Sequence, residues 1–153
     1  MIEKTAIFSP CRTYRYSLSR IWITAKPFVL FVCLNPSTAD ENTDDPTIRR
    51  CIRYADSWGY GGMVMCNLYA YRSTDPKILT NIPDPVGPDN DKYLSLNSMQ
   101  ADKTILAWGT NAREDRVITA MKILTNRHYL KLTKDGCPGH PLYLKKNLKP
   151  TPY

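Results

Sequence analysis

The sequence predicts a single α/β domain over residues 1–153, built as a three-layer sandwich with a central, mostly parallel four-stranded sheet and an N-terminal β-hairpin. The length is that of one ordinary domain. Short runs of apolar, β-branched and aromatic residues alternate with longer segments whose apolar residues recur at helical spacing. Strands that alternate with helices form parallel sheets covered by helices on both faces.

The first part of the chain is expected to form a hairpin and then a buried strand. Between residues 12 and 24, aromatic or apolar residues largely alternate with polar ones, a pattern typical of half-buried strands. Residues 28–34 (Phe-Val-Leu-Phe-Val-Cys-Leu) are apolar without interruption, which indicates a central strand buried on both faces. A polar loop over 35–45 follows this strand.

The first helix is expected directly after that loop. Asp45 is suited to cap it and Pro46 to occupy its first position, because proline lacks the N–H that would remain unpaired there. The glycine-rich segment 59–62 ends the helix, and residues 63–66 form the second strand. The apolar face follows the i, i+3, i+4, i+7 rule and consists of Ile48, Cys51, Ile52 and Ala55.

The second half of the chain repeats this alternation. Residues 83–88 are too rich in proline for a regular element and form a loop. A helix over 89–100, a strand over 104–108, a turn and helix cap at 109–111, a further helix and a strand over 129–133 complete the fold. The residues available for burial are Tyr93, Leu94, Leu96 and Met99 on the first of these helices, and Val117, Ile118, Met121 and Leu124 on the second.

The composition is that of a globular protein whose positive charge suits an anionic partner or serves solubility alone. Hydrophobic residues make up 42% of the chain and charged residues 23%, which excludes a disordered chain. No apolar run is long enough to cross a bilayer and the first residues lack the layout of a signal peptide, so we expect a cytoplasmic protein without a membrane partner. The formal net charge of +7 suits DNA or a nucleotide as partner, because Lys and Arg neutralise phosphates.

The cysteines and histidines predict neither a metal site nor a cofactor. The five cysteines form no C-x-x-C pair, and the two histidines, His128 and His140, lie well apart. Cys33 and Cys66 stand inside apolar runs, where a free thiol behaves as a small hydrophobe. A disulfide framework, a zinc site and an iron–sulfur cluster are therefore not expected.

Polar residues gather where the predicted strands end. Ligands of parallel α/β sheets bind beyond the carboxyl ends of the strands, so the loops after residues 34, 66, 108 and 133 are the candidate site. If the sheet is parallel, all four loops emerge at the same edge. They contain the motifs Asn35-Pro36-Ser37, Asn67-Leu68-Tyr69, Trp108-Gly109-Thr110-Asn111 and Gly139-His140-Pro141-Leu142.

These motifs resemble, in the same order, those of the uracil-DNA glycosylase superfamily. Its members carry a Gly-x-Asp-Pro or Gly-x-Asn-Pro motif after the first core strand, an Asn at the end of the next strand, a Trp-Gly turn, and a His-Pro-Ser-Pro-like motif near the C-terminus. The Leu-Asn-Pro-Ser-Thr-Ala-Asp stretch is also similar to the signature of a family of small bacterial and phage proteins. The resemblance spans residues 28–144 and implies the fold of that superfamily and hydrolysis of an N-glycosidic bond.

The chemistry of this hydrolysis gives roles to individual residues. The sugar gains positive charge in the transition state, and the departing base gains negative charge. Asn35 can orient the attacking water, and His140 can donate to a base oxygen, an interaction commonly worth about 3 kcal/mol. Asn67 offers a donor and an acceptor that match the Watson–Crick edge of a pyrimidine. Asp40 is the rival of Asn35 as water activator, because a carboxylate is the stronger base.

Further residues are candidates for substrate binding, and each also has a structural interpretation. Tyr69 or Tyr71 can stack on a base or pack in the core, while Arg72 or the helix start near Thr47 can hold phosphate. Asn35 can instead shape the turn before Pro36, and Asn67 can instead satisfy the backbone of its loop. The full set of predicted substrate-binding residues is Pro36, Ser37, Thr47, Asn67, Tyr69, Tyr71 and Arg72.

The sequence is therefore compatible with three candidate functions. The first is a glycosylase without lyase activity that acts on a uracil-like, mismatched or modified base in DNA. The second is an N-glycosidase of free nucleotides or nucleosides, favoured by the short chain and by Leu142-Tyr143 in place of the Ser-Pro that grips DNA in relatives. The third is a module that binds nucleic acid or a protein without catalysis, because a fold can outlive its activity.

Overall fold

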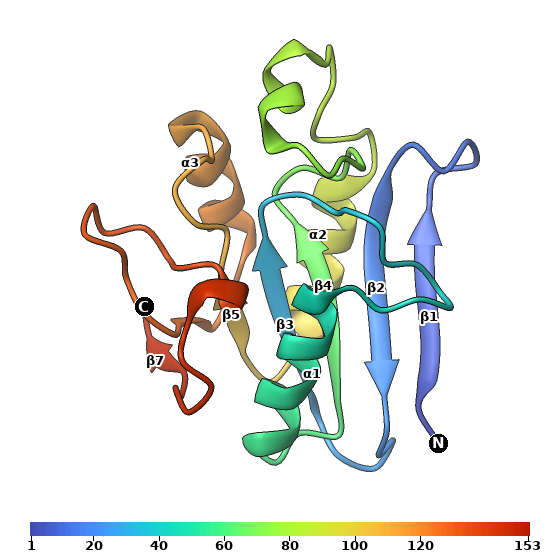
Figure 1. The fold of residues 1–153 in the computed structure, drawn as a ribbon, viewed down its shortest axis with the longest axis vertical. Coiled ribbons are helices and arrows are strands. Elements are labelled where there is room, and N and C mark those ends of the chain that lie inside the picture. The colour runs from blue at the N-terminus through green and yellow to red at the C-terminus, as the bar shows by residue number, and fades with distance from the viewer.

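The computed structural model describes residues 1–153 and shows an α/β protein with one seven-stranded mixed sheet, in the order β1-β2-β4-β3-β5-β6-β7 (Figure 1). The strands are β1 (Glu3–Phe8), β2 (Arg15–Ile21), β3 (Phe28–Cys33), β4 (Gly62–Asn67), β5 (Thr104–Leu106), β6 (Arg127–Tyr129) and β7 (Thr151–Pro152). The helices are α1 (Pro46–Ser57), α2 (Asn90–Gln100) and α3 (Glu114–Ile123), with two 3₁₀ helices, η1 (Pro76–Asn81) and η2 (Pro141–Tyr143).

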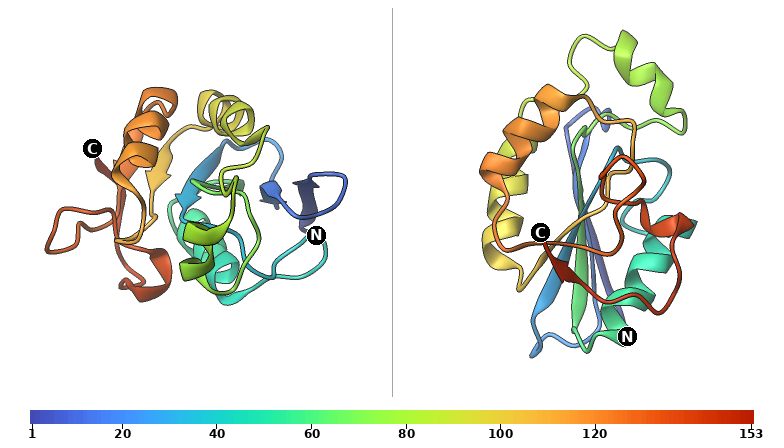
Figure 2. Two further views of the ribbon diagram at one scale, coloured as in Figure 1. Left: turned by 90° about the horizontal axis from the view of Figure 1, so that it is seen from above. Right: turned by 90° about the vertical axis from the view of Figure 1, so that its left-hand side faces the viewer.

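Parallel pairing is confined to the middle of the sheet. β4, β3, β5 and β6 pair in parallel, whereas β1 with β2, β2 with β4, and β6 with β7 pair antiparallel. The predicted four-stranded sheet is therefore too narrow, because antiparallel strands extend both of its edges. α2 and α3 cover one face of the sheet, and α1 covers the other with the C-terminal segment (Figure 2).

The N-terminal hairpin lies earlier in the chain than predicted. Residues 15–21 form the single strand β2, and its hairpin partner is β1 rather than a second arm within 12–24. The polar, exposed start of β1 lacks the alternating pattern that would have marked it as a strand. The alternation in 12–24 belongs to β2 alone, which lies between β1 and β4 and is mostly buried.

Helix α1 begins as the sequence predicts. The Asp45 carboxylate accepts a hydrogen bond from the Ile48 N–H at 2.9 Å, and Pro46 occupies the first helical position. Ile48 is 1% exposed, and Cys51 and Ala55 are fully buried with it against the sheet. The cap and this apolar face fix where the helix starts and which side it turns toward β3 and β4.

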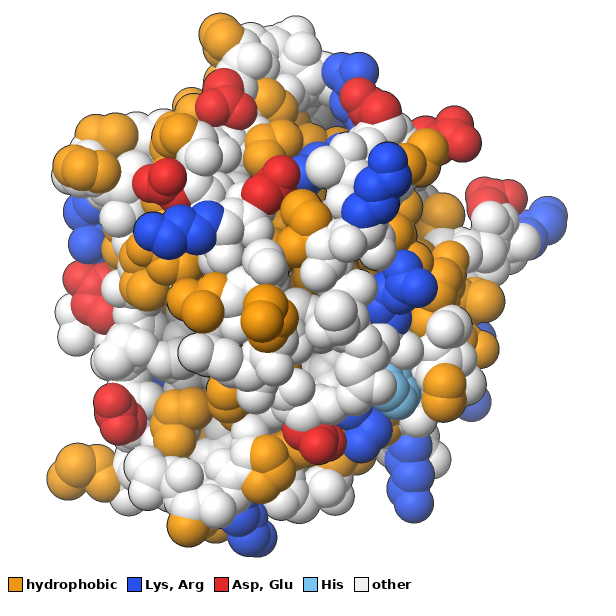
Figure 3. Space-filling view, turned by 180° about the vertical axis from the view of Figure 1, so that it is seen from behind, with side chains coloured by type: hydrophobic (Ala, Val, Ile, Leu, Met, Phe, Trp, Pro, Cys, Tyr) orange, Lys and Arg blue, Asp and Glu red, His pale blue; other side chains and the backbone are white.

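The other two helices bury fewer apolar residues than predicted. On α2 only Leu94 is a fully buried apolar residue, while Leu96 and Met99 are 45% and 73% exposed. On α3, Ile118 is exposed and Ala120 is buried in its place. Figure 3 views this side of the molecule, where apolar side chains are scattered among Lys, Arg, Asp and Glu. The side of α2 that faces the sheet carries the polar residues Asn90 and Ser98. The positions of its apolar residues therefore do not predict which face of the helix is buried.

Three boundaries also differ from the prediction. α3 begins at Glu114 after Arg113, which makes no side-chain capping bond, so the turn at 109–111 does not cap it. β5 ends at Leu106 instead of 108, and the last parallel strand is 127–129 instead of 129–133. The sheet nevertheless carries these loops to the same edge, because β3, β4, β5 and β6 run in parallel.

Candidate functional site

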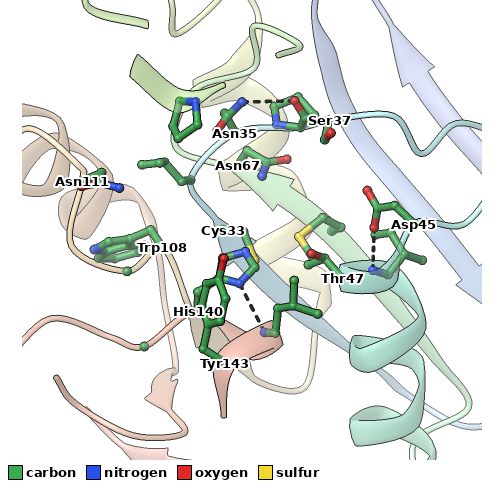
Figure 4. Close-up of a pocket in the computed structure, with 18 of the residues that line it drawn as sticks. Cys33, Asn35, Ser37, Asp45, Thr47, Asn67, Trp108, Asn111, His140 and Tyr143 are labelled. Atoms are coloured by element: carbon green, nitrogen blue, oxygen red, sulfur yellow. Dashed lines mark hydrogen bonds between the residues drawn. The ribbon is translucent and has the colours of Figure 1, made fainter. Parts of the chain in front are cut away.

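A cavity of about 430 Å³ opens at the carboxyl ends of the parallel strands (Figure 4). Its walls come from the loop after β3, the start of α1, the end of β4, the loop after β5, and the segment around η2. The predicted site residues that line it are Asn35, Pro36, Ser37, Thr47, Asn67 and His140. Residues separated by more than 100 positions in the sequence thus meet at one edge of the sheet.

Four predicted site residues lie outside this cavity. Asp40 uses its carboxylate to accept the N–H groups of Asn42 and Thr43, both at 2.8 Å, and these hydrogen bonds hold its pKa below the usual range. Tyr69 is buried, and its hydroxyl accepts the Arg113 N–H at 3.1 Å. The other two, Tyr71 and Arg72, line a separate groove beside the cavity.

Asn35 stabilises its own loop through two hydrogen bonds to backbone oxygens. Its Nδ2 donates to the Ser73 carbonyl oxygen at 2.9 Å and to the Pro36 carbonyl oxygen at 3.2 Å. Both donor hydrogens of the amide are therefore directed at backbone oxygens, and only Oδ1 is free to meet a ligand. Asn35 can accept a hydrogen bond from water or substrate but has no donor to spare.

Asn67 is held by a buried arginine that the sequence analysis missed. Arg15, at the start of β2, is 2% exposed, and its Nη2 donates to Asn67 Oδ1 at 3.3 Å. Its Nη1 donates to the Ala39 carbonyl oxygen, while its Nε has no partner. Asn67 is itself 2% exposed, and the contact with Arg15 turns its amide so that Nδ2 is the group left for a ligand.

His140 is prepared to donate a hydrogen bond. Its Nδ1 accepts the Leu142 N–H at 3.2 Å, which places the ring proton on Nε2 (Figure 4). Burial lowers the pKa of His140, against the opposing effect of the Asp45 carboxylate. The Tyr143 ring lies 5.6 Å from the imidazole between ring centres. At neutral pH His140 is therefore an uncharged donor in a partly buried position.

Helix α1 and the loop after β5 hold the His140 segment in place. Arg50 Nη1 donates to the Leu144 carbonyl oxygen at 3.1 Å, and the Tyr54 hydroxyl donates to the Lys145 carbonyl oxygen. The Gly109 N–H donates to the Pro138 carbonyl oxygen at 2.7 Å. Gly109 has a φ of +77°, in the left-handed region where glycine avoids the steric cost of a side chain.

Asp45 is the carboxylate of the cavity, although the sequence analysis treats it only as a helix cap. One of its oxygens accepts the Ile48 N–H, and the carboxylate also lines the cavity. Burial lowers the pKa of both Arg15 and His140, and the charge of Asp45 opposes that lowering. An aspartate before proline is fully explained as a cap, so no further signal in the sequence marks it as a site residue.

The charges of the cavity are an arginine and a carboxylate. Desolvation lowers the pKa of Arg15 to about 10, so its guanidinium stays charged at neutral pH. Trp108 is also a wall residue, at 4% exposure. No group of three or more His, Cys, Asp or Glu side chains is arranged to hold a metal ion. The cavity can bind a polar ligand through amides, an imidazole, a carboxylate and an aromatic ring.

The fold and the cavity define an α/β protein with a polar cavity at the carboxyl ends of its parallel strands. The chain belongs to the family described as Protein of unknown function (DUF1643), whose model matches residues 15–142. That range begins at Arg15 and includes His140, so it contains most of the cavity wall. No curated protein and no solved structure matches the chain. None of the helices combines the length and apolarity needed to span a bilayer.

Proposed function

We propose that this protein hydrolyses the N-glycosidic bond of a uracil-like, mismatched or modified nucleobase, on a fold of the uracil-DNA glycosylase type. One observation carries the proposal: an uncharged imidazole donor, a carboxylate and a fixed amide donor line the same cavity. The volume of about 430 Å³ lies within the range of small-molecule sites. The four sequence motifs also occur in the expected order at the ends of β3, β4 and β5 and before η2.

His140 acts on the departing base in this proposal. The base takes up the electrons of the broken bond, and negative charge develops on its carbonyl oxygens. A donor aimed at such an oxygen is commonly worth about 3 kcal/mol of barrier lowering. The N–H at Nε2 of a neutral histidine supplies it without adding a second positive charge to the cavity that Arg15 also lines.

Asp45 acts on the sugar. The anomeric carbon gains positive charge as the base leaves, and a carboxylate in a partly buried cavity stabilises that charge. The same group orients the attacking water, and the free Oδ1 of Asn35 accepts a second hydrogen bond from it. Asp45 thus takes the role that the sequence analysis gives to Asp40, whose carboxylate is occupied by its own loop.

Asn67 reads the base. Because Arg15 occupies its Oδ1, the amide presents Nδ2 as a donor, and a donor selects a base with a carbonyl oxygen at that point. A base with an amino group at that point would place its own N–H donor against the Asn67 Nδ2 donor, and no hydrogen bond would form. Replacing the matched partner of a buried polar group costs more than losing an apolar contact, so this residue can give strong discrimination.

The test measures free base released by the wild type and by two variants, the isosteric Asp45→Asn and His140→Asn, which removes the Nε2 donor. The substrates are single-stranded and duplex DNA with uracil, mismatched or modified bases, and a pool of free nucleotides, with release followed by mass spectrometry. Asp40→Asn is the matched control, because it removes the same charge outside the cavity. We expect release by the wild type and Asp40→Asn, and a loss of at least about 100-fold in the other two.

The outcomes separate the three functions. Release from DNA supports the glycosylase, and release from nucleotides alone supports the nucleotide hydrolase. No release from any substrate, where a known glycosylase succeeds, refutes catalysis and leaves a binding module. Equal losses in Asp40→Asn and Asp45→Asn would remove Asp45 from its assigned role.

A further inference from the structure

A shallow groove adjoins the cavity and shares Ser37, Ser73 and Thr74 with it. The remaining lining comes from the hairpin turn between β1 and β2, from the residue after Ser37, and from the segment after β4: Arg12, Thr13, Thr38, Tyr71 and Arg72. The groove and the cavity are therefore adjacent, because both are bordered by Ser37, Ser73 and Thr74. None of the groove residues is acidic, and two of them are arginines.

The two arginines are gathered on one aromatic ring. The guanidinium carbon of Arg12 lies 3.8 Å from the centre of the Phe8 ring, and that of Arg72 lies 4.8 Å from it. Arg72 Nη1 donates to the Arg12 carbonyl oxygen at 3.3 Å, which holds the two residues together. Bringing two positive charges onto one ring costs electrostatic energy unless an anion compensates for them.

The protein supplies only part of that compensation. Arg12 pairs with Glu41 at 3.0 Å, whereas Arg72 has no carboxylate partner, and its buried Nε has no hydrogen-bond partner of any kind. Arg12 also holds a left-handed backbone with a φ of +60°, which Gly or Asn would adopt at lower cost. The groove therefore contains an uncompensated guanidinium, framed by the hydroxyl groups of Ser37, Thr38 and Thr74.

We propose that this groove is a phosphate subsite, in which Arg72 and Arg12 bind the phosphate ester attached to the sugar whose base enters the cavity. Guanidinium groups bind phosphate oxygens in pairs of parallel hydrogen bonds, and serine and threonine hydroxyls are common phosphate donors. The inference rests on the proposed function for the sugar between the two sites. It assigns the substrate to the phosphorylated class and excludes the bare nucleoside as the preferred substrate.

The test is binding by calorimetry, with probes that lack a base and so do not depend on which base is recognised. The phosphate-bearing probes are 2-deoxyribose 5-phosphate and a short single DNA strand with a central tetrahydrofuran abasic site; 2-deoxyribose is the phosphate-free control. The variants are Arg72→Gln and Arg12→Gln. Arg53→Gln is matched in charge, because Arg53 is exposed on α1 and lies outside both sites.

We expect at least one phosphate-bearing probe to bind, and 2-deoxyribose to bind at least about tenfold more weakly. Arg72→Gln should weaken the phosphate-bearing probe about tenfold and Arg12→Gln less, because Glu41 already compensates Arg12. Arg53→Gln should stay within about twofold of the wild type. Binding of the sugar phosphate identifies a nucleotide monoester as the source of the phosphate, and binding of the strand alone identifies a nucleic-acid backbone.

Three results would overturn the subsite: no phosphate-bearing probe binds more tightly than 2-deoxyribose, both groove variants bind like the wild type, or Arg53→Gln loses as much affinity as Arg72→Gln. The Arg12→Gln measurement keeps the test decisive if Arg72→Gln fails to fold by circular dichroism. Failure of the two proposals can be told apart. Arg72-dependent binding without base release refutes the hydrolysis alone, and base release without arginine-dependent binding refutes the groove alone.

Discussion

Asp45 combines two tasks that single substitutions can separate. Its carboxylate caps α1 through the Ile48 N–H, and it also gives the cavity its negative charge. Asparagine is as good an N-cap as aspartate, while alanine costs about 1 kcal/mol at such a position. Asp45→Ala should therefore lower the free energy of unfolding by about 1 kcal/mol, and Asp45→Asn should change it by less than about 0.5 kcal/mol. Urea denaturation measures both.

The same two variants should lose base release to the same extent, because both lack the charge. Activity that follows stability instead, with Asp45→Asn close to the wild type, would show that the residue acts only as a cap. The comparison needs no assumption about the substrate once any released base has been detected.

His140 makes stability depend on pH in a defined window. Burial lowers its pKa in the folded protein below the value of about 6.5 that it has in the unfolded chain. Below pH 6.5 the imidazole of His140 therefore binds a proton in the unfolded chain but stays neutral in the folded protein. For this reason the free energy of unfolding falls as the pH falls toward the folded pKa. Above pH 6.5 both states are neutral and the contribution is constant.

Urea denaturation at about pH 7.5 and about pH 5.5 tests this for the wild type and His140→Asn. Asparagine keeps an acceptor for the Leu142 N–H but does not titrate, so the variant should lose less stability between the two pH values. Equal losses in the two proteins would mean that the folded and unfolded pKa values of His140 coincide. Base release should decline only at the lower end of this range, as the pH falls through the folded pKa of His140, because protonation removes the Nδ1 acceptor that orients the ring.

Some site residues could be predicted from the sequence, and others could not, because their positions depend on long-range pairing or have another sufficient explanation. Asn67 and His140 stand next to the ends of predicted strands, where local order along the chain already places a side chain at the sheet edge. Arg15 reaches the cavity from β2, which is joined to the parallel strands through an antiparallel pair that no local pattern predicts. Asp45 is hidden because its role as a cap is a sufficient explanation of the residue.

At the scale of elements, two buried arginines of β2 tie the loop between β3 and α1 to the sheet: Arg15 at the Ala39 carbonyl oxygen, and Arg20 closer to the helix. Arg20 is fully buried in β2, and its Nε donates to the Asp44 carboxylate at 2.7 Å. Its Nη2 donates to the Asp40 carbonyl oxygen at 2.6 Å. The arginine thus ties the loop to the sheet one residue before Asp45, and so sets where the capping carboxylate lies.

Replacement of Arg20 by methionine should lower the free energy of unfolding by about 3 kcal/mol, because it leaves Asp44 and buried carbonyl groups without their donor. Arg53→Met is the control on the exposed face of α1 and should cost less than about 0.5 kcal/mol. A loss below about 1 kcal/mol in Arg20→Met would show that the loop keeps its position without this residue.

The elements differ in how far local sequence determines them. α1 could be predicted in detail because cap, proline and apolar face agree. The position of α2 could be predicted but its inner face could not, because the polar residues Asn90 and Ser98 are buried there. Asn90 Nδ2 donates to the carbonyl oxygens of Asn67 and Leu68, and the Ser98 hydroxyl hydrogen-bonds to the Thr104 hydroxyl. Burial of polar residues with internal partners leaves no apolar periodicity to detect.

At the scale of the whole molecule, the sheet separates two apolar cores. Alternate residues of the central strands face opposite sides, so Phe31 and Ile105 pack toward α1 while Leu30 and Leu106 pack toward α2 and α3. Parallel strands buried on both faces read as continuous apolar runs, which is why the central sheet could be predicted. The antiparallel edge strands β1 and β7 are exposed and lack such runs, so the number of strands in the sheet could not be predicted from the sequence.

The prediction of one domain over residues 1–153 implies that the two cores unfold together. Ile105→Val should cost about 1 kcal/mol on the α1 side, and Leu94→Ala about 3 kcal/mol on the side of α2. Because the sheet lies between them, the double variant should lose the sum of the two within about 0.5 kcal/mol. Urea denaturation followed by both fluorescence and circular dichroism should give one coincident transition with an unchanged dependence on denaturant. Two separate transitions, each shifted by one of the substitutions, would instead mean that each core unfolds independently. Because residues from both sides of the sheet line the cavity, the cavity would then open before the sheet unfolds.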